Sequence, residues 1–371
     1  MKKLLVLLLT LAMTFSFVAC GGNKSADEGA THKVAMITDY GDITDESFNQ
    51  ATYEGSKEFC EANSVDFTYY KPAGDSTADR VAMIDKAVAD GYNVVVMPGY
   101  AFGEAIGQVA DNYPDVKFIA LDVSEGDLGD YKIGENVYCA VYQEELAGFM
   151  AGFAAVELGY KHLGFLGGMA VPAVVRYGYG FIQGAEWAAS VGEGIDVTIE
   201  HVYANQFFGD ADITAYMDTW YKDGVECVFA CGGGVYTSAA EAAAKVGGKV
   251  IGVDVDPAPT IDQYAEGMTV TSAMKGLAAT VKTALGDLIL NDNWAEYGGK
   301  VVTLGLVSGD DPTQNYVQLP ASTQWDENGF NEAAYKDLVK MLFDGTITVS
   351  NDIEKEPETT TVKVNYQGNI K

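Results

Sequence analysis

Short apolar runs alternate with amphipathic helical patterns along most of the chain. Each run is bounded by turn residues, as in strands that are buried on both faces of a parallel sheet. The segments between the runs repeat apolar residues at the spacing of one helix face. The expected strands are 34–37, 65–70, 94–97 and 118–121 in a first series and 163–166, 197–202, 228–230 and 250–253 in a second, and the expected helices are 46–61, 76–90, 103–112, 173–191, 211–224 and 235–246.

The strands of the two series start at closely similar spacings. Strands that alternate with helices form parallel sheets with helices on both faces. We therefore expect an α/β protein made of two Rossmann-like halves. The other expected elements are an extended stretch at 136–142, a helix rich in Ala and Gly at 144–158, a helix at 275–291, a strand at 301–307, a helix at 331–343 and an edge strand at 359–364.

The start of the chain has the pattern of an export signal. Lys2 and Lys3 precede an apolar run at 4–18 that is too short for the usual membrane span. The run ends in Phe17-Val-Ala-Cys20, which is similar to a bacterial lipobox except at Phe17, where Leu is usual. We expect a lipid on Cys20 to hold the protein on the outer face of the cell membrane. A plain secretory signal is the alternative.

The chain is acidic and poor in metal-binding side chains. Its 371 residues carry 53 acids against 23 bases, and the net charge of −30 disfavours binding to nucleic acid. The cysteines beyond Cys20 lie in apolar or helical contexts that are typical of small buried side chains, and the three histidines are scattered. We expect no metal site and no cofactor. These cysteines are Cys60, Cys139, Cys227 and Cys231.

Acids and glycines follow the expected strands, at the edge where open α/β sheets bind ligands. Asp39, Asp122 and Asp254 follow strands of the two halves, and Gly232-Gly-Gly234 follows another. Carboxylates accept charge-assisted hydrogen bonds from hydroxyls, and glycines let backbone N–H groups approach a ligand. Three acids without matching arginines favour a neutral polyol such as a ribose and disfavour a phosphate.

Catalytic motifs are weak in this sequence. Gly232-Gly-Gly234 lacks the third small residue of a dinucleotide fingerprint, and the chain has no P-loop and no G-x-S-x-G turn. None of the histidines lies at the end of an expected strand. Acids at strand ends are able to act as general acid and base, so an enzyme stays open as an alternative. A binding protein is the favoured interpretation.

A series of motifs extends along nearly the whole chain beyond the start. They are Asp39-Tyr-Gly-Asp, Ser47-Phe-Asn-Gln, Asn112-Tyr-Pro-Asp-Val-Lys-Phe118 with Asp122, Glu145 with Ala147-Gly and Ala151-Gly, Gly164-Phe-Leu-Gly-Gly168, Gly180-Phe-Ile-Gln-Gly-Ala185, Gly252-Val-Asp-Val-Asp256 and Thr271-Ser-Ala-Met-Lys275. Together they resemble the basic-membrane-protein lipoproteins, which are the purine-nucleoside-binding components of ABC importers.

The resemblance implies a type I periplasmic-binding-protein fold, with two lobes, three hinge crossings and a ligand in the cleft. It implies a purine nucleoside as ligand, permease and ATPase subunits of an ABC transporter as partners, and no enzymatic activity. A sugar-binding or a ligand-sensing lipoprotein of the same fold is the alternative. The expected division is a signal peptide at 1–20, a tether at 21–32, a first lobe at 33–142 plus 273–300, and a second lobe at 143–272 plus 301–371.

In the first lobe, the resemblance implies that Asp39 and Asp122 face the nucleoside. It implies that Phe48 stacks on the base and that Asn49 lies nearby. Without the resemblance, Phe48 in the first turn of a helix is more typical of a core anchor.

In the second lobe, Asp254 and Lys275 match the acid and the lysine that contact the ribose, and Gly233 matches the backbone approach to the ligand. Lys275 alone is also compatible with a solvated lysine at a helix start. The second stacking aromatic is Phe207 or Phe208, and the Phe-x-Asp pattern favours Phe208.

The segment after Asp256 departs from the pattern of the family. The family has Gln where this chain has Pro257, and an insertion-like stretch at 258–263 follows. We expect this stretch to reshape the rim of the cleft. Elsewhere, we expect Glu145 to be a structural hydrogen-bond partner, and Tyr100 and Trp187 to be packing residues.

Overall fold

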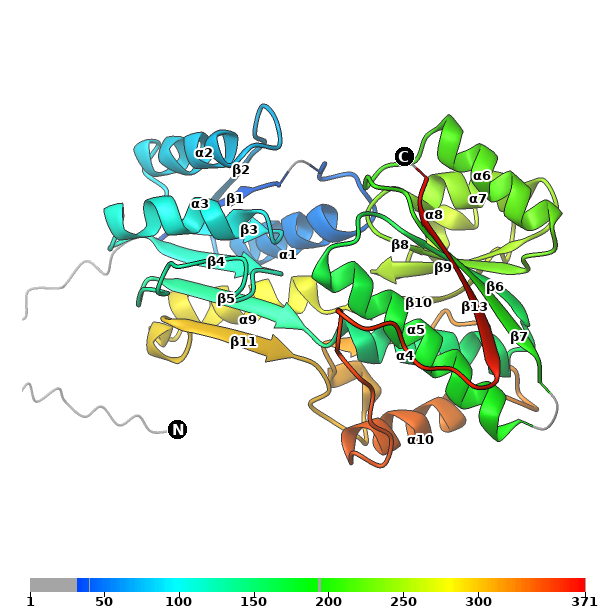
Figure 1. Ribbon diagram of the computed structural model, residues 1–371. Helices are drawn as coiled ribbons and strands as arrows, with labels where there is room; N and C mark the ends of the chain where they lie inside the picture. The colour runs from blue at the N-terminus through cyan, green and yellow to red at the C-terminus, as the bar shows by residue number, and fades with distance from the viewer. Residues whose placement is uncertain (1–31, 40, 193–194, 371) are drawn as a thin grey trace, which may run out of the picture. The chain divides into compact units, whose positions relative to one another are not determined.

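The computed structural model describes residues 32–39, 41–192 and 195–370, which form two sheets flanked by helices (Figure 1). The expected signal peptide, Cys20 and the tether before His32 lie outside these residues. The first sheet contains β1 (Lys33–Ile37), β2 (Asp66–Tyr70), β3 (Val94–Pro98), β4 (Lys117–Leu121), β5 (Val137–Tyr142) and β11 (Lys300–Leu304). Its strand order is β11-β5-β4-β3-β1-β2, and all neighbours are parallel.

The second sheet has the order β12-β10-β9-β8-β6-β7-β13. Its neighbours are parallel except β12, which runs antiparallel to β10. Its members are β6 (His162–Gly167), β7 (Val197–Tyr203), β8 (Cys227–Cys231), β9 (Lys249–Asp254), β10 (Thr269–Lys275), β12 (Val317–Gln318) and β13 (Val362–Asn369). The edge strand expected at 359–364 is thus present as β13, next to β7.

Helices cover both faces of each sheet, because successive residues of a buried strand point to opposite sides. In β1, Val34 and Met36 pack towards α1 and α9, whereas Ala35 and Ile37 pack towards α2 and α3. The second sheet packs α4 and α5 on one face and α6 and α7 on the other. The helices are α1 (Phe48–Ala62), α2 (Thr77–Ala89), α3 (Phe102–Val109), α4 (Glu144–Glu157), α5 (Pro172–Val191), α6 (Ala211–Lys222), α7 (Tyr236–Ala244), α8 (Ala258–Ile261), α9 (Leu277–Ile289) and α10 (Glu332–Phe343), with short 3-10 turns at Ala110–Asn112, Trp294–Glu296 and Pro312–Gln314.

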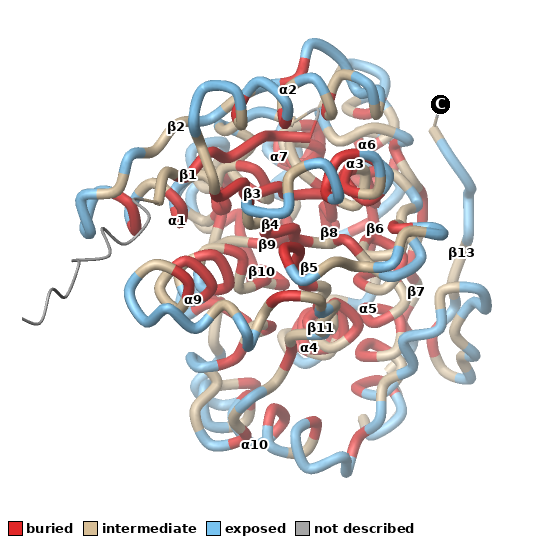
Figure 2. Tube along the Cα trace, turned by 90° about the vertical axis from the view of Figure 1, so that its left-hand side faces the viewer, coloured by how far each residue is buried: buried red, intermediate tan, exposed pale blue. Residues whose placement is uncertain are grey.

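The inner strands of both sheets are buried along most of their length, whereas the edge strands β2, β11 and β13 are mostly exposed or half-buried (Figure 2). The four cysteines expected to be small buried side chains are indeed buried and carry free thiols. Among the described residues, no helix combines the length and the apolar character that a membrane span needs.

Helices α4 and α5 lie in very close contact, as the Ala- and Gly-rich sequence of α4 suggested. Two glycines of each helix face the backbone of the other, and a Cβ atom at any of them would collide with a carbonyl oxygen of the opposite helix. The glycines are Gly148, Gly152, Gly180 and Gly184.

The chain crosses between the two sheets after β5, after β10 and after β11. This arrangement is the two-lobed α/β fold with three crossings that we expected. Two expected boundaries differ from the structure. Residues 273–275, which we expected in the first lobe, belong to β10 in the second sheet, and all of β11, Lys300–Leu304, pairs with β5 in the first sheet. The residues from 301 to 304, which we expected in the second lobe, therefore lie in the first.

Strand β10 was absent from the expected elements, and the helix expected from Lys275 starts at Leu277. The strand is rich in hydroxyl side chains, so it lacks the apolar run that identifies its neighbours. Its buried hydroxyl groups form hydrogen bonds within the fold. Thr271 Oγ1 lies 2.7 Å from Thr323 Oγ1, and Ser272 Oγ donates to the carbonyl oxygen of Val255 at 2.5 Å. The short elements β12 and α8 also lacked a recognisable pattern.

Candidate functional site

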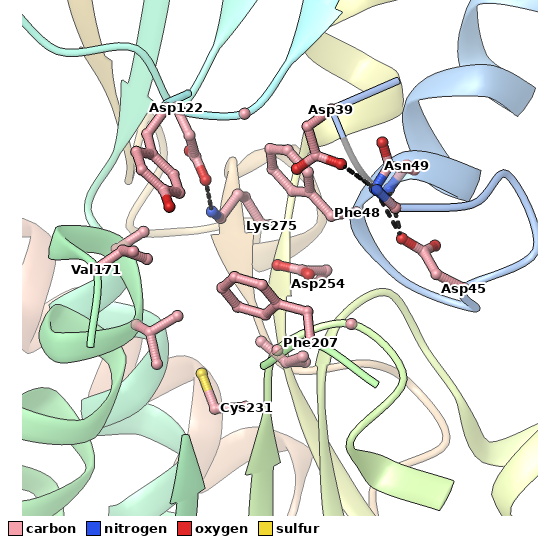
Figure 3. A pocket seen from close by; sticks show the side chains of 18 of the residues that line it. Asp39, Asp45, Phe48, Asn49, Asp122, Val171, Phe207, Cys231, Asp254 and Lys275 are labelled. Carbon is pink, nitrogen blue, oxygen red and sulfur yellow. Dashed lines mark hydrogen bonds and ion pairs between the residues drawn. The ribbon is translucent and has the colours of Figure 1, made fainter. Parts of the chain in front are cut away.

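A cavity of about 340 Å³ lies between the carboxyl ends of the strands of the two sheets (Figure 3). This volume is within the range of small-molecule sites, roughly 300–1,000 Å³. The loops after β1, β3 and β4 line it from the first lobe, and the ends of β8, β9 and β10 and the start of α5 line it from the second. All eight residues that we expected to contact a ligand line this cavity: Asp39, Phe48, Asn49, Asp122, Phe208, Gly233, Asp254 and Lys275.

Lys275 links the two lobes at the floor of the cavity. It is the last residue of β10, and its Nζ lies 2.7 Å from Asp122 Oδ2, directly after β4. The same Nζ lies 3.1 Å from Glu144 Oε1, and Arg176 Nε lies 2.6 Å from Glu144 Oε2. The third cation that lines the cavity, Lys71, lies 2.7 Å from Asp42, so each of the three is paired with a carboxylate, which disfavours a phosphate ligand.

The carboxylates around Lys275 set its charge state. Burial lowers the pKa of this ammonium, but Asp122, Glu144 and Asp254 outweigh burial and raise it, so Lys275 stays protonated. Burial also raises the pKa of Asp122, to about 6, against the effect of Lys275. For Glu144, burial is opposed by Lys275 and Arg176, and its pKa is lowered. The solvated lysine at a helix start, our alternative interpretation of Lys275, is wrong, because the residue is 5% exposed.

Asp122 has one carboxylate oxygen directed at Lys275 and one without a protein partner. Its Oδ1 is buried and lacks a hydrogen bond. The backbone of Asp122 has a φ of +58°, a left-handed conformation that non-glycine residues rarely adopt. A buried acceptor without a partner is costly, so the geometry favours a ligand that donates a hydrogen bond to Oδ1.

Asp254 has the corresponding position at the end of β9, with a φ of +66°. Its Oδ2 accepts a hydrogen bond from Ser47 Oγ at 2.6 Å, and Oδ1 accepts one from the Tyr177 hydroxyl at 3.4 Å. Burial raises the pKa of Asp254, and Lys275 opposes this effect. Both carboxylate oxygens of Asp254 thus have protein partners, whereas in Asp122 only Oδ2 has one.

Asn49 lies between two carboxylates at the first-lobe side of the cavity (Figure 3). Its Nδ2 donates to Asp39 Oδ1 at 3.2 Å and to Asp45 Oδ2 at 3.1 Å, and its Oδ1 is buried without a partner. Asp45 also accepts hydrogen bonds from the backbone N–H groups of Ser47 and Gln50. The N-cap position of α1 is Ser47, and the carboxylate of Asp45 caps the backbone N–H groups of the first turn.

Two phenylalanine rings face the cavity from opposite lobes. Phe48 starts α1, and its ring centroid lies 5.2 Å from Lys275 Nζ. From the second lobe, the ring of Phe207 points into the cavity (Figure 3), whereas Phe208 lies at the edge and is 62% exposed. The Phe-x-Asp pattern favoured Phe208, but of the two residues it is Phe207 whose ring faces the cavity.

Gly233 brings backbone to the cavity wall after β8, with a φ of +50°. A Cβ atom at this position would approach the carbonyl oxygen of Phe207 to 2.7 Å. Both the positive φ and the lack of space for a Cβ atom therefore favour glycine at this position, as the strand-end pattern suggested.

Several site residues were missed by sequence reasoning. Glu144, Arg176 and Tyr177 lie in helices with no local sign of a site, and only their pairing with Lys275 and Asp254 identifies them. We singled out Glu145, but the adjacent Glu144 makes the ion pairs. Tyr100, which we expected to be a packing residue, lines the cavity.

No group of His, Cys, Asp and Glu side chains among the described residues is arranged to hold a metal ion. Two sheets joined by three crossings, with a cavity between their carboxyl edges, define a two-lobed small-molecule-binding protein. The cavity presents acceptors and aromatic rings, and its cations are paired internally.

Comparison with known proteins identifies the family. Residues 32–343 match the family described as ABC transporter substrate-binding protein PnrA-like, and the chain belongs to this family. The chain is 27% identical over 334 residues to the ABC transporter nucleoside-binding protein BmpA of Lactococcus lactis subsp. cremoris, covering 83% of this chain and 90% of the relative. It is 27% identical over 322 residues to an uncharacterized lipoprotein of Pyrococcus furiosus, covering 83% and 77%.

A solved structure supports the fold. The ABC transporter solute-binding protein from Conexibacter woesei superposes with a TM-score of 0.66 at 21% identity, covering 86% of this chain and 99% of that one. The family match confirms the resemblance inferred from the motifs, and the superposition confirms the fold class.

Proposed function

We propose that this protein captures a purine nucleoside in the cavity between its lobes and delivers it to the permease and ATPase subunits of an ABC importer. One observation carries the proposal. Acceptors without hydrogen-bond partners and two phenylalanine rings converge on one cavity whose cations are already neutralised. A nucleoside supplies the matching groups, namely ribose hydroxyls that donate and a flat base that stacks.

The roles of the individual residues follow from this arrangement. Asp122 accepts from a ribose hydroxyl through Oδ1, and Lys275 holds its other oxygen. Phe48 and Phe207 stack on the base from the two lobes, and Asn49 lies near its edge. The name of the Lactococcus relative, a nucleoside-binding protein, supports the ligand class.

The proposal includes the location of the protein. A lipid on Cys20 anchors it at the outer face of the cell membrane, and the tether lets it reach the transporter. The Pyrococcus relative, named as a lipoprotein, supports this part. Metabolic labelling with a fatty acid, compared between the natural chain and Cys20→Ser, tests it, and equal labelling of both would refute the anchor.

Calorimetric titration tests the ligand. The mature chain carrying Cys20→Ser is titrated with adenosine, guanosine and inosine, and with ribose and glucose as controls. We expect binding of at least one nucleoside, an increase in melting temperature, and recovery of the nucleoside unchanged after long incubation. Binding of a sugar without any nucleoside would favour a sugar-binding protein, and turnover of the nucleoside would indicate an enzyme.

The choice between transport and sensing needs a cellular measurement. Uptake of radiolabelled nucleoside is expected to fall when the gene is deleted and to return when it is restored. Unchanged uptake together with nucleoside binding in vitro would favour a sensor.

A further inference from the structure

The turn between β1 and α1 reaches across the cleft and contacts the second lobe directly. Ser47 Oγ donates to Asp254 Oδ2 at 2.6 Å, in a contact where both residues are buried. One residue earlier in the chain, Glu46 Oε2 accepts a hydrogen bond from Thr260 Oγ1 at 3.2 Å. Two successive residues of the first lobe are therefore bound to two separate elements of the second, the end of β9 and α8.

The two surfaces fit closely at this point. Glu46 and Ser47 face residues of β9, α7 and α8, and the space left between them is about 10 Å³. Such a space holds at most about one water molecule. The Ser47–Asp254 hydrogen bond is buried, so solvent replaces it only when the lobes separate, whereas the Glu46–Thr260 hydrogen bond is partly buried.

The turn is held rigid from within the first lobe. Asp45 accepts the backbone N–H groups of Ser47, Asn49 and Gln50, each at 3.0 Å. Glu46 has a φ of +50°, a conformation that costs energy for a non-glycine residue and persists only where its surroundings enforce it. Because the turn is rigid, loss of the contacts made by Glu46 and Ser47 also displaces the residues that follow, Phe48 and Asn49.

Asp254 differs from Asp122 in a way that this contact explains. Asp122 Oδ1 has no protein partner, whereas both oxygens of Asp254 accept from hydroxyl groups of the protein. One of those hydroxyls belongs to the opposite lobe. Asp254 is thus placed to join the lobes as well as to face the ligand.

We propose that Ser47 and Thr260 form a latch that holds the two lobes closed and sets how long a ligand is retained. The Thr260 half of the latch comes from α8, the short helix that follows β9. Retention rests on the proposed function, but the closure itself does not depend on the identity of the ligand.

Two variants and a matched control test the latch. Thr260→Val removes the donor with little change in volume, and Ser47→Ala removes the donor to Asp254. Thr77→Val is the control, because the Thr77 hydroxyl donates to Glu104 Oε2 at 2.7 Å within the first lobe. We expect the dissociation rate of adenosine, measured by stopped flow, to rise about 3- to 10-fold in Thr260→Val and at least as much in Ser47→Ala. The control is expected to match the natural protein.

A double-mutant cycle identifies the partner of Thr260. Glu46→Gln leaves the hydroxyl of Thr260 with a weaker acceptor, so Thr260→Val is expected to have a smaller effect in that background. Strictly additive effects of the two substitutions on the dissociation rate would show that the pair does not act together.

Lobe closure is measured separately from ligand binding. Spin labels at Ala89→Cys and Ala215→Cys, exposed positions on helices of the two lobes, report the distance between them. We expect the closed fraction to fall in Thr260→Val and Ser47→Ala, with or without adenosine, and to stay unchanged in Thr77→Val. If no nucleoside binds but the closed fraction still falls, the proposed function fails and the latch stands. Unchanged closed fractions and dissociation rates in Thr260→Val would overturn the latch, even if Ser47→Ala fails to fold.

Discussion

Asp122 is the residue whose removal separates ribose recognition from base recognition. Asp122→Ala removes the oxygen that lacks a protein partner, and a charged acceptor of this kind contributes about 1.5–3 kcal/mol. We expect the affinity for adenosine to fall roughly ten- to a hundredfold, and the preference for ribo- over deoxyribonucleosides to be lost. Titration with adenosine and its 2′- and 3′-deoxy analogues measures both effects.

Phe48→Ala is the comparison for this prediction. It removes stacking area that contributes on the order of 1–3 kcal/mol, and it is expected to weaken all these nucleosides about equally. If Asp122→Ala keeps the natural preference for the ribose, Asp122 does not contact the ribose hydroxyls.

Glu145 predicts a pH dependence of stability. Burial raises the pKa of this side chain to about 7 from an ordinary 4.5, and its Oε2 has no hydrogen-bond partner. The folded protein therefore keeps a proton that the unfolded chain releases, and stability falls as the pH rises from 4.5 through 7. The full loss is about 3 kcal/mol. Glu145→Gln is expected to be more stable than the natural protein at pH 8 and equally stable at pH 4.

Urea unfolding at both pH values measures this effect. Glu266→Gln, at an exposed position, is the control and is expected to change stability little at either pH. An equal effect of Glu145→Gln at pH 4 and pH 8 would show that Glu145 titrates normally in the folded protein.

Single residues of the site were predictable where they directly follow an apolar run that marks a buried strand. Asp39, Asp122 and Asp254 follow apolar runs, so their place at a sheet edge could be read directly. Glu144 and Arg176 could not, because each lies in a helix and gains its role only when α4 and α5 pack beside Lys275. The choice between Phe207 and Phe208 depended on which ring turns inward, and adjacent positions in a loop carry no periodicity to decide this.

At the scale of elements, the packing of α4 against α5 yields a stability prediction. Gly152→Ala would place a methyl group against the carbonyl of Phe181, which is rigid helix backbone. Overpacking of this kind costs about 1–3 kcal/mol or more, and we expect a corresponding loss in the free energy of unfolding.

Gly286→Ala in α9 is the matched control. A Cβ there would lie 3.7 Å from Phe59 Cε2, which is an ordinary van der Waals contact. Alanine favours the helix over glycine, so this variant is expected to be neutral or stabilising by up to about 1 kcal/mol. Equal effects of the two substitutions would mean that α4 and α5 are able to separate at little cost.

Elements were predictable in proportion to the strength of their periodicity. Apolar strands such as β3 and β8 stood out, whereas β10 did not, because its hydroxyl residues are satisfied only by distant segments of the chain. The pairing of β11 with the first sheet could not be predicted either, since no local pattern indicates which of the two sheets a strand near the end of the chain joins.

At the scale of the whole molecule, Cys231 reports opening of the cleft. Its thiol lines the cavity and is 1% exposed, and burial raises its pKa far above the usual range. Alkylation therefore requires separation of the lobes. Saturating adenosine is expected to slow the modification of Cys231 at least about tenfold, because it stabilises the closed form.

Mass spectrometry of peptides after timed alkylation measures the effect at each cysteine. Cys139, buried in β5 away from the cavity, is the internal control for global unfolding. Cys231 reacting at the same rate with and without adenosine, while adenosine binds, would mean that its exposure is unrelated to closure.

The three crossings also determine when each lobe can fold. The first sheet receives its edge strand β11 only near residue 304, and the second receives β13 only at residues 362–369. During synthesis, neither lobe has all of its strands until most of the chain has been made. Each lobe's completion therefore waits on long-range pairing, which is intrinsically slow.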